Sequence, residues 1–103
     1  MITLLVKEAE TLGDKSIGLL SAKKPYALML RTRFGIHTFG MKFAIDVVVL
    51  DQKGRVVGMK ENLLPNRFHF WNPSYDTIVE LPTGTIAVKK IDVGQKIRIQ
   101  KVR

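Results

Sequence analysis

The sequence contains no cysteine, and this absence removes several kinds of site at once. A chain without thiols has no disulfide framework, no thiol nucleophile and no thiolate metal site. It also lacks any apolar run near the roughly 20 residues that a transmembrane helix needs. The N-terminal stretch MITLLVKEAET has no basic start, long apolar stretch or small-residue cleavage site, so no export signal is expected. These absences favour a soluble, cytoplasmic protein without a membrane partner.

Acidic residues are few, because nine of them stand against seventeen lysines and arginines, for a formal net charge of +8. The imbalance is greatest from Lys89 to Arg103, where Asp92 is the only acidic residue. A basic surface of this kind attracts nucleic acid, anionic lipid or an acidic protein. The alternative is an ordinary solvated strand face, since the charges of KIRIQKVR alternate with apolar residues.

Apolar residues make up 46% of the 103 residues and recur along the chain, which is enough for one core and one domain spanning residues 1–103. Short β-branched runs between Gly, Pro, Asn and Asp residues predict strands joined by tight turns. The predicted strands are Ile2–Val6, Tyr26–Arg31, Thr38–Phe43, Ile45–Leu50, Arg55–Met59, Thr77–Leu81 and Lys96–Val102. A short helix is predicted within Thr11–Ala22 and a helical turn within Gly84–Lys90. We therefore expect a mainly β fold, α+β at the margin: a curled antiparallel sheet or small barrel with one or two short helices.

Two local features refine this expectation. Asp51–Gly54 predicts a four-residue hairpin loop, with Gly54 suited to a left-handed backbone. The two strands on either side of Ala44 are candidates for one long strand bent at that residue. The segment Leu64–Asp76, rich in Pro, Asn and aromatic residues, predicts a structured excursion rather than a linker.

Two polar residues near the most apolar strand are candidates for chemistry. Asp46 interrupts a run of strand formers, where carboxylates are disfavoured. It either accepts hydrogen bonds from backbone or arginine groups, or contributes a carboxylate to a pocket. His37 lies at a loop-to-strand junction and has the chemistry of a general base or a metal ligand. The spacing of the two histidines matches no metal motif, and no serine lies in a nucleophile motif, so neither a metal nor a cofactor is expected.

The excursion also contains a candidate aromatic surface, formed by Phe68, Phe70, Trp71 and Tyr75. Such residues either present a stacking platform for a base or a sugar, or cap one end of a small core. The sequence alone leaves both alternatives open.

Several motifs then occur in a fixed order: Ile36–Val57, Leu63–Arg67, Val79–Thr85 and Ile91–Gly94, preceded by GLL at Gly18–Leu20. In this order they resemble the bacterial and archaeal family called domain of unknown function 192, over about residues 18–99. The chain departs from the family at Ala44, where proline is common, and at Gln95, where an acidic residue is usual. The resemblance implies a compact, mainly β domain, and it implies no established activity.

Glu80, like Asp46, is a charged residue inside a predicted strand. Together with Lys42 and Arg67, these carboxylates are expected to form one charged cluster near His37. Such a cluster is either a buried ion network or the floor of a small ligand-binding pocket.

Small size, a single domain and the lack of a catalytic motif favour a non-catalytic binding module for a small polar ligand or a partner protein. A hydrolase-like enzyme using His37 with Asp46 or Glu80 is the first alternative. Nucleic-acid binding through a basic C-terminal face is the second, and it would require Lys89, Lys90, Lys96 and Arg98 to lie together. Both a monomer and a homodimer remain open, because exposed edge strands can pair.

Overall fold

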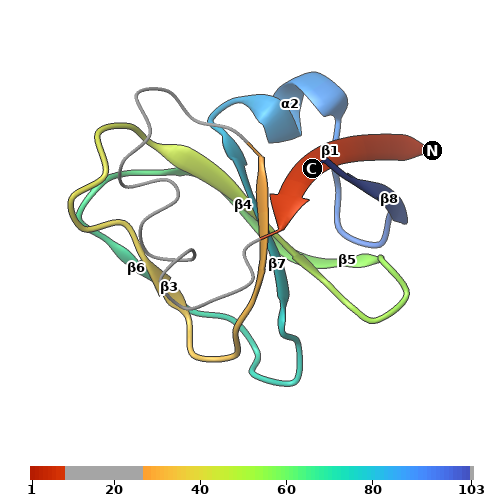
Figure 1. Cartoon of the computed structure of the whole chain (residues 1–103), viewed down its shortest axis with the longest axis horizontal. Helices are drawn as coiled ribbons and strands as arrows, with labels where there is room; N and C mark the ends of the chain where they lie inside the picture. Colours follow the sequence, from red (N-terminus) through yellow and green to blue (C-terminus); the bar gives the residue numbers. More distant parts are fainter. Residues whose placement is uncertain (9–26, 103) are drawn as a thin grey trace.

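Within residues 1–8 and 27–102, which the computed structural model describes, a strongly curled sheet of six strands forms most of the fold (Figure 1). Its strands are β1 (Ile2–Glu8), β2 (Leu28–Arg31), β4 (Ile45–Leu50), β5 (Val56–Leu63), β7 (Thr77–Pro82) and β8 (Ile97–Lys101). Two very short strands, β3 (Ile36–His37) and β6 (Phe68–His69), pair separately, and the short helix α2 (Thr85–Lys89) follows β7. The mainly β, compact fold expected from the sequence is confirmed.

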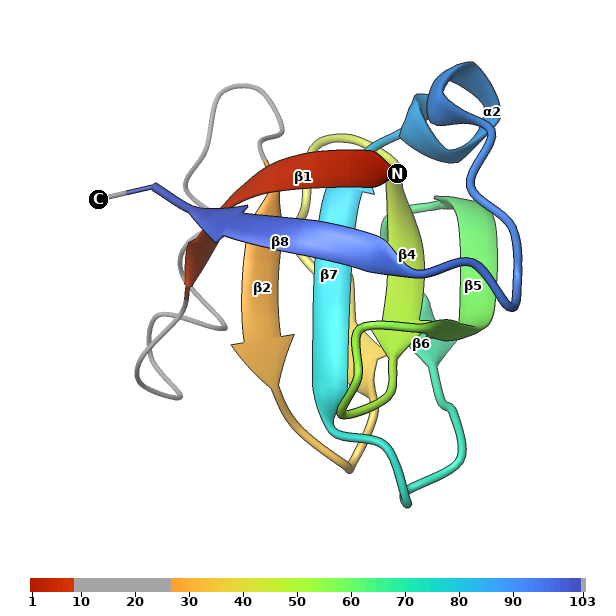
Figure 2. The same cartoon turned by 90° about the vertical axis from the view of Figure 1, so that its right-hand side faces the viewer.

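The strands of the large sheet are joined in the order β5-β4-β7-β2-β1-β8. Neighbours from β5 to β2 are antiparallel, whereas β1 runs parallel to both β2 and β8. The sheet curls until its edge strands meet: the N–H of Val56 donates to the carbonyl of Gln95 (2.8 Å), and that of Ile97 to the carbonyl of Gly54 (2.9 Å). The result is a half-barrel in which β1 and β8 cross over the remaining strands (Figure 2). Parallel pairing requires a long connection between the two strands, and β1 is separated by long stretches of chain from both β2 and β8.

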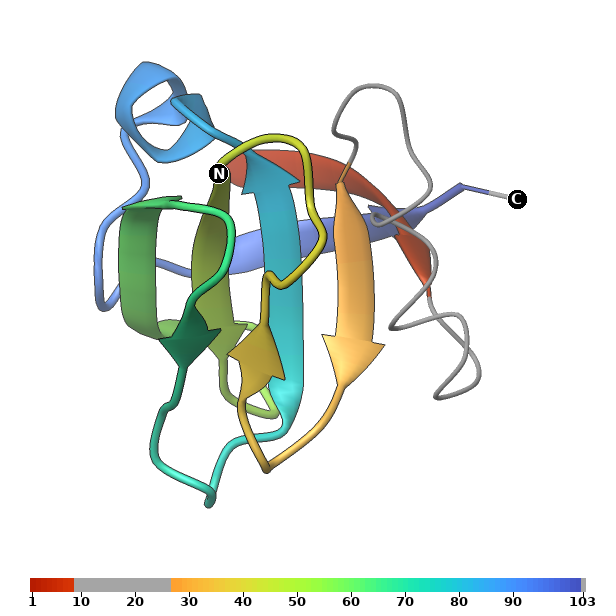
Figure 3. The same ribbon diagram turned by 90° about the vertical axis from the view of Figure 1, so that its left-hand side faces the viewer.

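The sheet is apolar on both faces. Inside the curl, side chains of β4, β7, β1 and β8 form one core cluster, which includes Val48 and Leu81. On the outer face, Val47 and Ile78 belong to a second cluster, which β3, β6 and their loops cover (Figure 3). Every residue of β4 is therefore buried, which explains why its sequence is a continuous apolar run rather than an alternating one.

The prediction of a strand over Thr38–Phe43 is wrong, because β4 begins only at Ile45. The carbonyl of Thr38 accepts the N–H of Met41 (3.2 Å), and Gly40 has a φ of 81°. This turn carries the chain from β3 to β4 and ends any extended run there. Alternating apolar residues at positions 39, 41 and 43 imitate a strand, although they lie in a loop.

The predicted hairpin is confirmed. The N–H of Asp51 donates to the carbonyl of Arg55 (2.9 Å), and Gly54 adopts a φ of 83°. The return strand β5 continues to Leu63 instead of ending at Met59. The helical turn after Gly84 is confirmed as α2, whereas the helix predicted within Thr11–Ala22 and the start of the second strand at Tyr26 lie outside the described residues.

None of the helices in the described part of the chain is long and apolar enough to cross a membrane.

Candidate functional site

Asp46 is fully buried (0% exposed), and its carboxylate is bound by two backbone groups. One oxygen accepts the N–H of Asn62 and the other accepts the N–H of Ile86, both at 2.9 Å. The register of β4 against β5 shifts between Ile45 and Val47, so that β5 bulges at this point, and the left-handed Asn62 (φ 53°) lies in the bulge. A bulge leaves a backbone donor without a ladder partner. Asp46 supplies that partner and also ties the bulge to the first turn of α2.

The predicted cluster of Asp46 with Glu80 does not form, because the two carboxylates are on opposite faces of the sheet. Across the β4–β7 pair, Asp46 is level with Leu81, and Val47 is level with Glu80. Leu81 belongs to the core inside the curl, whereas Val47 belongs to the cluster on the outer face. Residues level with each other point to the same face, so one carboxylate points into the curl and the other points away from it.

Glu80 is 5% exposed and lies between the apolar cross-strand neighbours Leu28 and Val47. No hydrogen bond or ion pair of its carboxylate is found within the described part of the chain. Burial disfavours the charged form and raises the pKa of Glu80 to about 7. Glu80 is therefore a carboxyl group that changes charge near neutral pH in an apolar setting.

His37, Lys42 and Arg67 are all exposed; His37 ends β3, Arg67 directly precedes β6, and Lys42 lies in the loop between β3 and β4. Nδ1 of His37 accepts the N–H of Phe39 (3.3 Å), and the guanidinium of Arg67 donates to the carbonyls of Pro65 (3.4 Å) and Asn66 (3.2 Å). Over residues 1–8 and 27–102, no hydrogen bond or ion pair joins these three side chains to either buried carboxylate.

The four residues of the predicted aromatic surface divide into two pairs. Phe68 and Phe70 are exposed, whereas Trp71 and Tyr75 pack against the outer core cluster. The indole N–H of Trp71 donates to the carbonyl of Tyr75 (2.8 Å), which closes the loop between them. One pair therefore caps the core, and the other faces solvent.

Sequence reasoning assigned no role to two further residues, Thr38 and His69. Thr38 is fully buried, and its hydroxyl donates to the carbonyl of Leu64 (2.6 Å) while accepting the N–H of Arg67 (3.0 Å). His69 points inward beside Trp71, and burial, followed by the charge of Lys60, lowers its pKa. Nothing in the sequence around Thr38 indicates that its side chain is buried. For His69, the alternation of side chains along FHFW does place it on the inner face.

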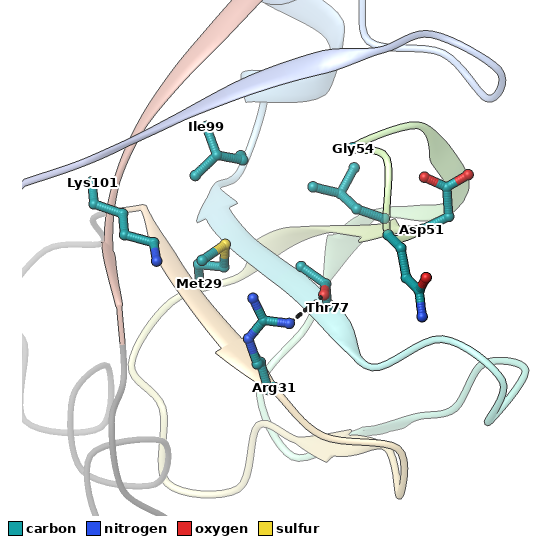
Figure 4. A pocket seen from close by; sticks show the side chains of 9 residues that line it. Met29, Arg31, Asp51, Gly54, Thr77, Ile99 and Lys101 are labelled. Atoms are coloured by element: carbon teal, nitrogen blue, oxygen red, sulfur yellow. Dashed lines mark hydrogen bonds between the residues drawn. The ribbon is translucent and has the colours of Figure 1, made fainter.

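A cleft of about 310 Å³ opens at the end of the half-barrel away from α2 (Figure 4). Side chains from β2, β7, β8 and the β4–β5 turn meet there. They are Met29, Arg31, Leu50, Asp51, Gln52, Gly54, Thr77, Ile99 and Lys101. Met29, Leu50 and Ile99 form its apolar wall, while the polar side chains stand around the opening. The sequence signal for this cleft is weak: Lys101 shares the inward face of β8 with two isoleucines.

The polar groups of the cleft have defined partners. Arg31 donates through Nη1 to the hydroxyl of Thr77 (3.3 Å), as drawn in Figure 4. Nζ of Lys101 forms an ion pair with Glu8 (2.8 Å). Oδ1 of Asp51 accepts the N–H groups of Arg55 (2.9 Å) and Lys53 (2.8 Å), and the bond from Arg55 is the main reason that the pKa of Asp51 is lowered. The carboxylate of Asp51 is therefore bound to the backbone of the hairpin, and most of the other polar groups around the cleft are hydrogen-bond donors.

The part of the chain that the structure describes contains no group of three or more His, Cys, Asp or Glu residues placed to hold a metal ion.

These features define a class of protein: a small β half-barrel with a polar-rimmed cleft at one end and a covered outer face. The chain belongs to the DUF192 family, described as an uncharacterized ACR, whose profile matches residues 2–99. This confirms the resemblance noted in the sequence.

Curated relatives carry no activity in their names. A UPF0127 protein of Pyrococcus furiosus is 31% identical over 102 residues, covering 93% of this chain and 87% of the relative. A UPF0127 protein of Pyrococcus abyssi is 31% identical over 98 residues, covering 89% and 83%. A crystal structure of a protein of unknown function from Novosphingobium aromaticivorans superposes with a TM-score of 0.73 at 15% identity, covering 88% of this chain and 71% of that one. This likeness supports the fold alone.

Proposed function

We propose that the protein is a non-catalytic binding module that takes a small anionic ligand in the cleft at the end of the half-barrel. The single observation that supports this is the composition of the cleft, in which an apolar wall is combined with the cationic donors of Arg31 and Lys101. Ligand sites typically have this character, with mostly apolar linings and a few polar groups that fix orientation. A cavity of about 310 Å³ is at the small end of the usual range, which suits a metabolite rather than a polymer.

The chemistry of the rim favours an anion. The guanidinium of Arg31 offers a planar set of donors that matches a carboxylate or phosphate. Lys101 is half-exposed and forms an ion pair with Glu8. Because exposed ion pairs contribute only about 0–1 kcal/mol, Lys101 can exchange Glu8 for an anionic ligand at little cost in free energy. The apolar wall would then contact the uncharged part of the ligand.

The lack of a reactive pair in the cleft supports binding rather than catalysis. Asp51 is the only carboxylate among the described residues that line the cleft, and it is bound to the hairpin backbone. The enzyme alternative of His37 with Asp46 or Glu80 has less support. His37 is exposed, the carboxylate of Asp46 is bound by two backbone donors, and Glu80 is buried between Leu28 and Val47. On β8, Lys101 lines the cleft whereas Arg98 points to the opposite face, so the proposed site does not use the residues of the basic C-terminal face.

The test is thermal unfolding with inorganic phosphate, dicarboxylic acids and mononucleotides. A ligand at one hundred times its Kd should stabilise by about 2.7 kcal/mol, which raises Tm by about 10 °C or more in a domain of this size. Lys101→Ala should reduce this shift. Arg98→Ala is the matched control, because it removes one positive charge from the same strand on the opposite face.

If Lys101→Ala and Arg98→Ala reduced the ligand-induced rise in Tm equally, binding would depend only on the net charge of the protein. This result would contradict a site in the cleft. No shift with any anion at millimolar concentration would contradict the proposal as well. Size-exclusion chromatography of the same samples separates ligand binding from self-association.

A further inference from the structure

Four rings form a continuous row on the outer side of the small β3–β6 sheet; we refer to His37, Phe39, Phe68 and Phe70 as the aromatic row. Adjacent ring centroids are 5.5 Å, 4.8 Å and 5.9 Å apart in that order. The row crosses from one strand to the other because His37 is level with Phe68 in the β3–β6 pair. Segments about thirty residues apart in sequence thus place their rings side by side.

The row is exposed, yet its members are held in place. Phe68 is 62% and Phe70 is 66% exposed, while Trp71, which follows Phe70, packs against the outer core cluster. The ring of Phe70 lies directly against Gly35, where an added Cβ would come within 2.5 Å of its Cδ1. The buried Thr38 bonds the β3 side to the segment at Arg67. Contiguous exposed rings on a fixed scaffold mark an interaction site more often than incidental surface.

The charges beside the row favour an anionic occupant. The two segments that form it, residues 33–44 and 64–76, contain Arg33, Lys42 and Arg67 against the single acidic Asp76. Asp76 is paired with Arg33 (3.6 Å), and no ion pair of Lys42 or Arg67 is found among residues 1–8 and 27–102. A second copy of the chain is a poor occupant, because each copy has a net charge of +8.

We infer that the aromatic row binds single-stranded nucleic acid, with bases stacked on its rings and phosphates paired with Lys42 and Arg67. Every base has a π-face, so a row of rings beside cations binds single strands with little sequence preference. Phe68 and Phe70 are nearly parallel (16°). A base inserted between them would need two stacking steps of about 3.4 Å each, more than their 5.9 Å separation allows. Bases therefore stack on the outward faces of the rings.

This surface is independent of the cleft. The cleft opens among residues of the inner core cluster, whereas the aromatic row stands over the outer cluster on the other side of the sheet. The small-ligand proposal and this inference can therefore fail separately.

The experiment is fluorescence anisotropy with the intact chain and labelled oligothymidine and oligoadenosine of about 12 nucleotides, within the site sizes typical of such surfaces. Phe68→Leu and Phe70→Leu keep apolar bulk but remove the π-face. Each should weaken binding by roughly five- to a hundredfold. Val88→Ala is the control, because it changes an exposed apolar residue on α2, on the other side of the sheet. A duplex of the same sequence should bind more weakly, because its bases are already stacked.

Salt dependence tests the role of the cations. Lys42→Ala should lower the slope of log K against log salt by about 0.7, the value for one phosphate contact on a single strand. Lys89→Ala, an exposed lysine on α2, should leave the slope unchanged. Thermal unfolding of each variant confirms that the fold is retained.

Three outcomes would overturn the inference. Binding unchanged in both leucine variants would show that the rings do not stack on bases. If an acidic peptide bound and oligonucleotides did not, and if Phe68→Leu and Phe70→Leu still bound that peptide, the row would be assigned to an apolar protein partner. Self-association that depends on Phe68 would assign it to a second copy of the chain.

Discussion

The carboxylate of Asp46 accepts the backbone N–H of Ile86, forty residues further along the chain, at 2.9 Å. Its other oxygen accepts the N–H of Asn62 at the same distance. One side chain thus satisfies a donor in the bulge of β5 and a donor in the first turn of α2. Unpaired buried N–H groups are costly, so this aspartate keeps three parts of the half-barrel in register.

Replacing Asp46 by Asn tests this role. An amide has only one acceptor oxygen, so an NH₂ group would face one of the two backbone donors. We expect Asp46→Asn to lower the free energy of unfolding by about 1–3 kcal/mol, the cost of one buried donor without a partner. Urea denaturation of the variant and the natural protein measures the difference.

Asp51→Asn is the control, because Oδ1 of Asp51 alone accepts both backbone N–H groups and lies in the exposed hairpin turn. Its effect should be clearly smaller, since the amide oxygen of asparagine can keep both bonds and water is available at this turn. If the two variants lost equal stability, the use of both carboxylate oxygens by buried donors would not be the reason that Asp46 matters.

Glu80 should make stability depend on pH. Its pKa in the folded protein is raised from 4.5 to about 7 by burial, so the folded state binds more protons than the unfolded state between these values. The contribution of Glu80 to the free energy of unfolding is therefore greatest below about pH 4.5, falls as pH rises towards 7, and is constant above that. The total loss from this one group is about 3 kcal/mol.

Glu80→Gln should remove this dependence, because its side chain has no charge to bury. Relative to the natural protein, the variant should gain stability steadily between pH 4.5 and about 7, as measured by urea denaturation at a series of pH values. Glu61→Gln, at an exposed position of β5, should not change the slope. A constant difference between Glu80→Gln and the natural protein over this range would contradict the raised pKa.

Much of the fold followed from local chemistry in the sequence. The hairpin at Asp51–Gly54 combines a residue that binds turn N–H groups with a glycine at positive φ, and both features are visible without a structure. β4 was predictable from its apolar run. The structural alternative for Asp46 also came from a general rule, namely that buried carboxylates are paired.

The arrangement of the candidate sites depended on information that the sequence does not contain. Whether Asp46 and Glu80 share a face depends on the register of β4 against β7, and a shift of one residue would have reversed the answer. The cleft combines side chains from Met29 to Lys101, which only the curl of the sheet brings together. The turn at Gly40 was missed because its flanking residues alternate as in a strand.

The contact between Gly35 and Phe70 provides a test of how the aromatic row is held. Gly35 has a φ of 87°, and a Cβ there would lie 2.5 Å from Cδ1 of Phe70 and 2.9 Å from the carbonyl oxygen of His69. The ring could move aside, but the carbonyl belongs to β6. Gly35→Ala should therefore destabilise the protein by the roughly 1–2 kcal/mol of a left-handed alanine plus the cost of displacing β6. Equilibrium unfolding in urea measures the loss.

Gly84→Ala separates these two costs, because Gly84 has nearly the same φ (91°), but a Cβ added there would meet no atom within 4 Å. Only the backbone cost applies there. Gly35→Ala should thus be the more destabilising of the two. It alone should also weaken the binding of any ligand that contacts Phe68 and Phe70. Equal destabilisation by the two alanines would mean that Phe70 and β6 yield freely, and that the row is not a fixed surface.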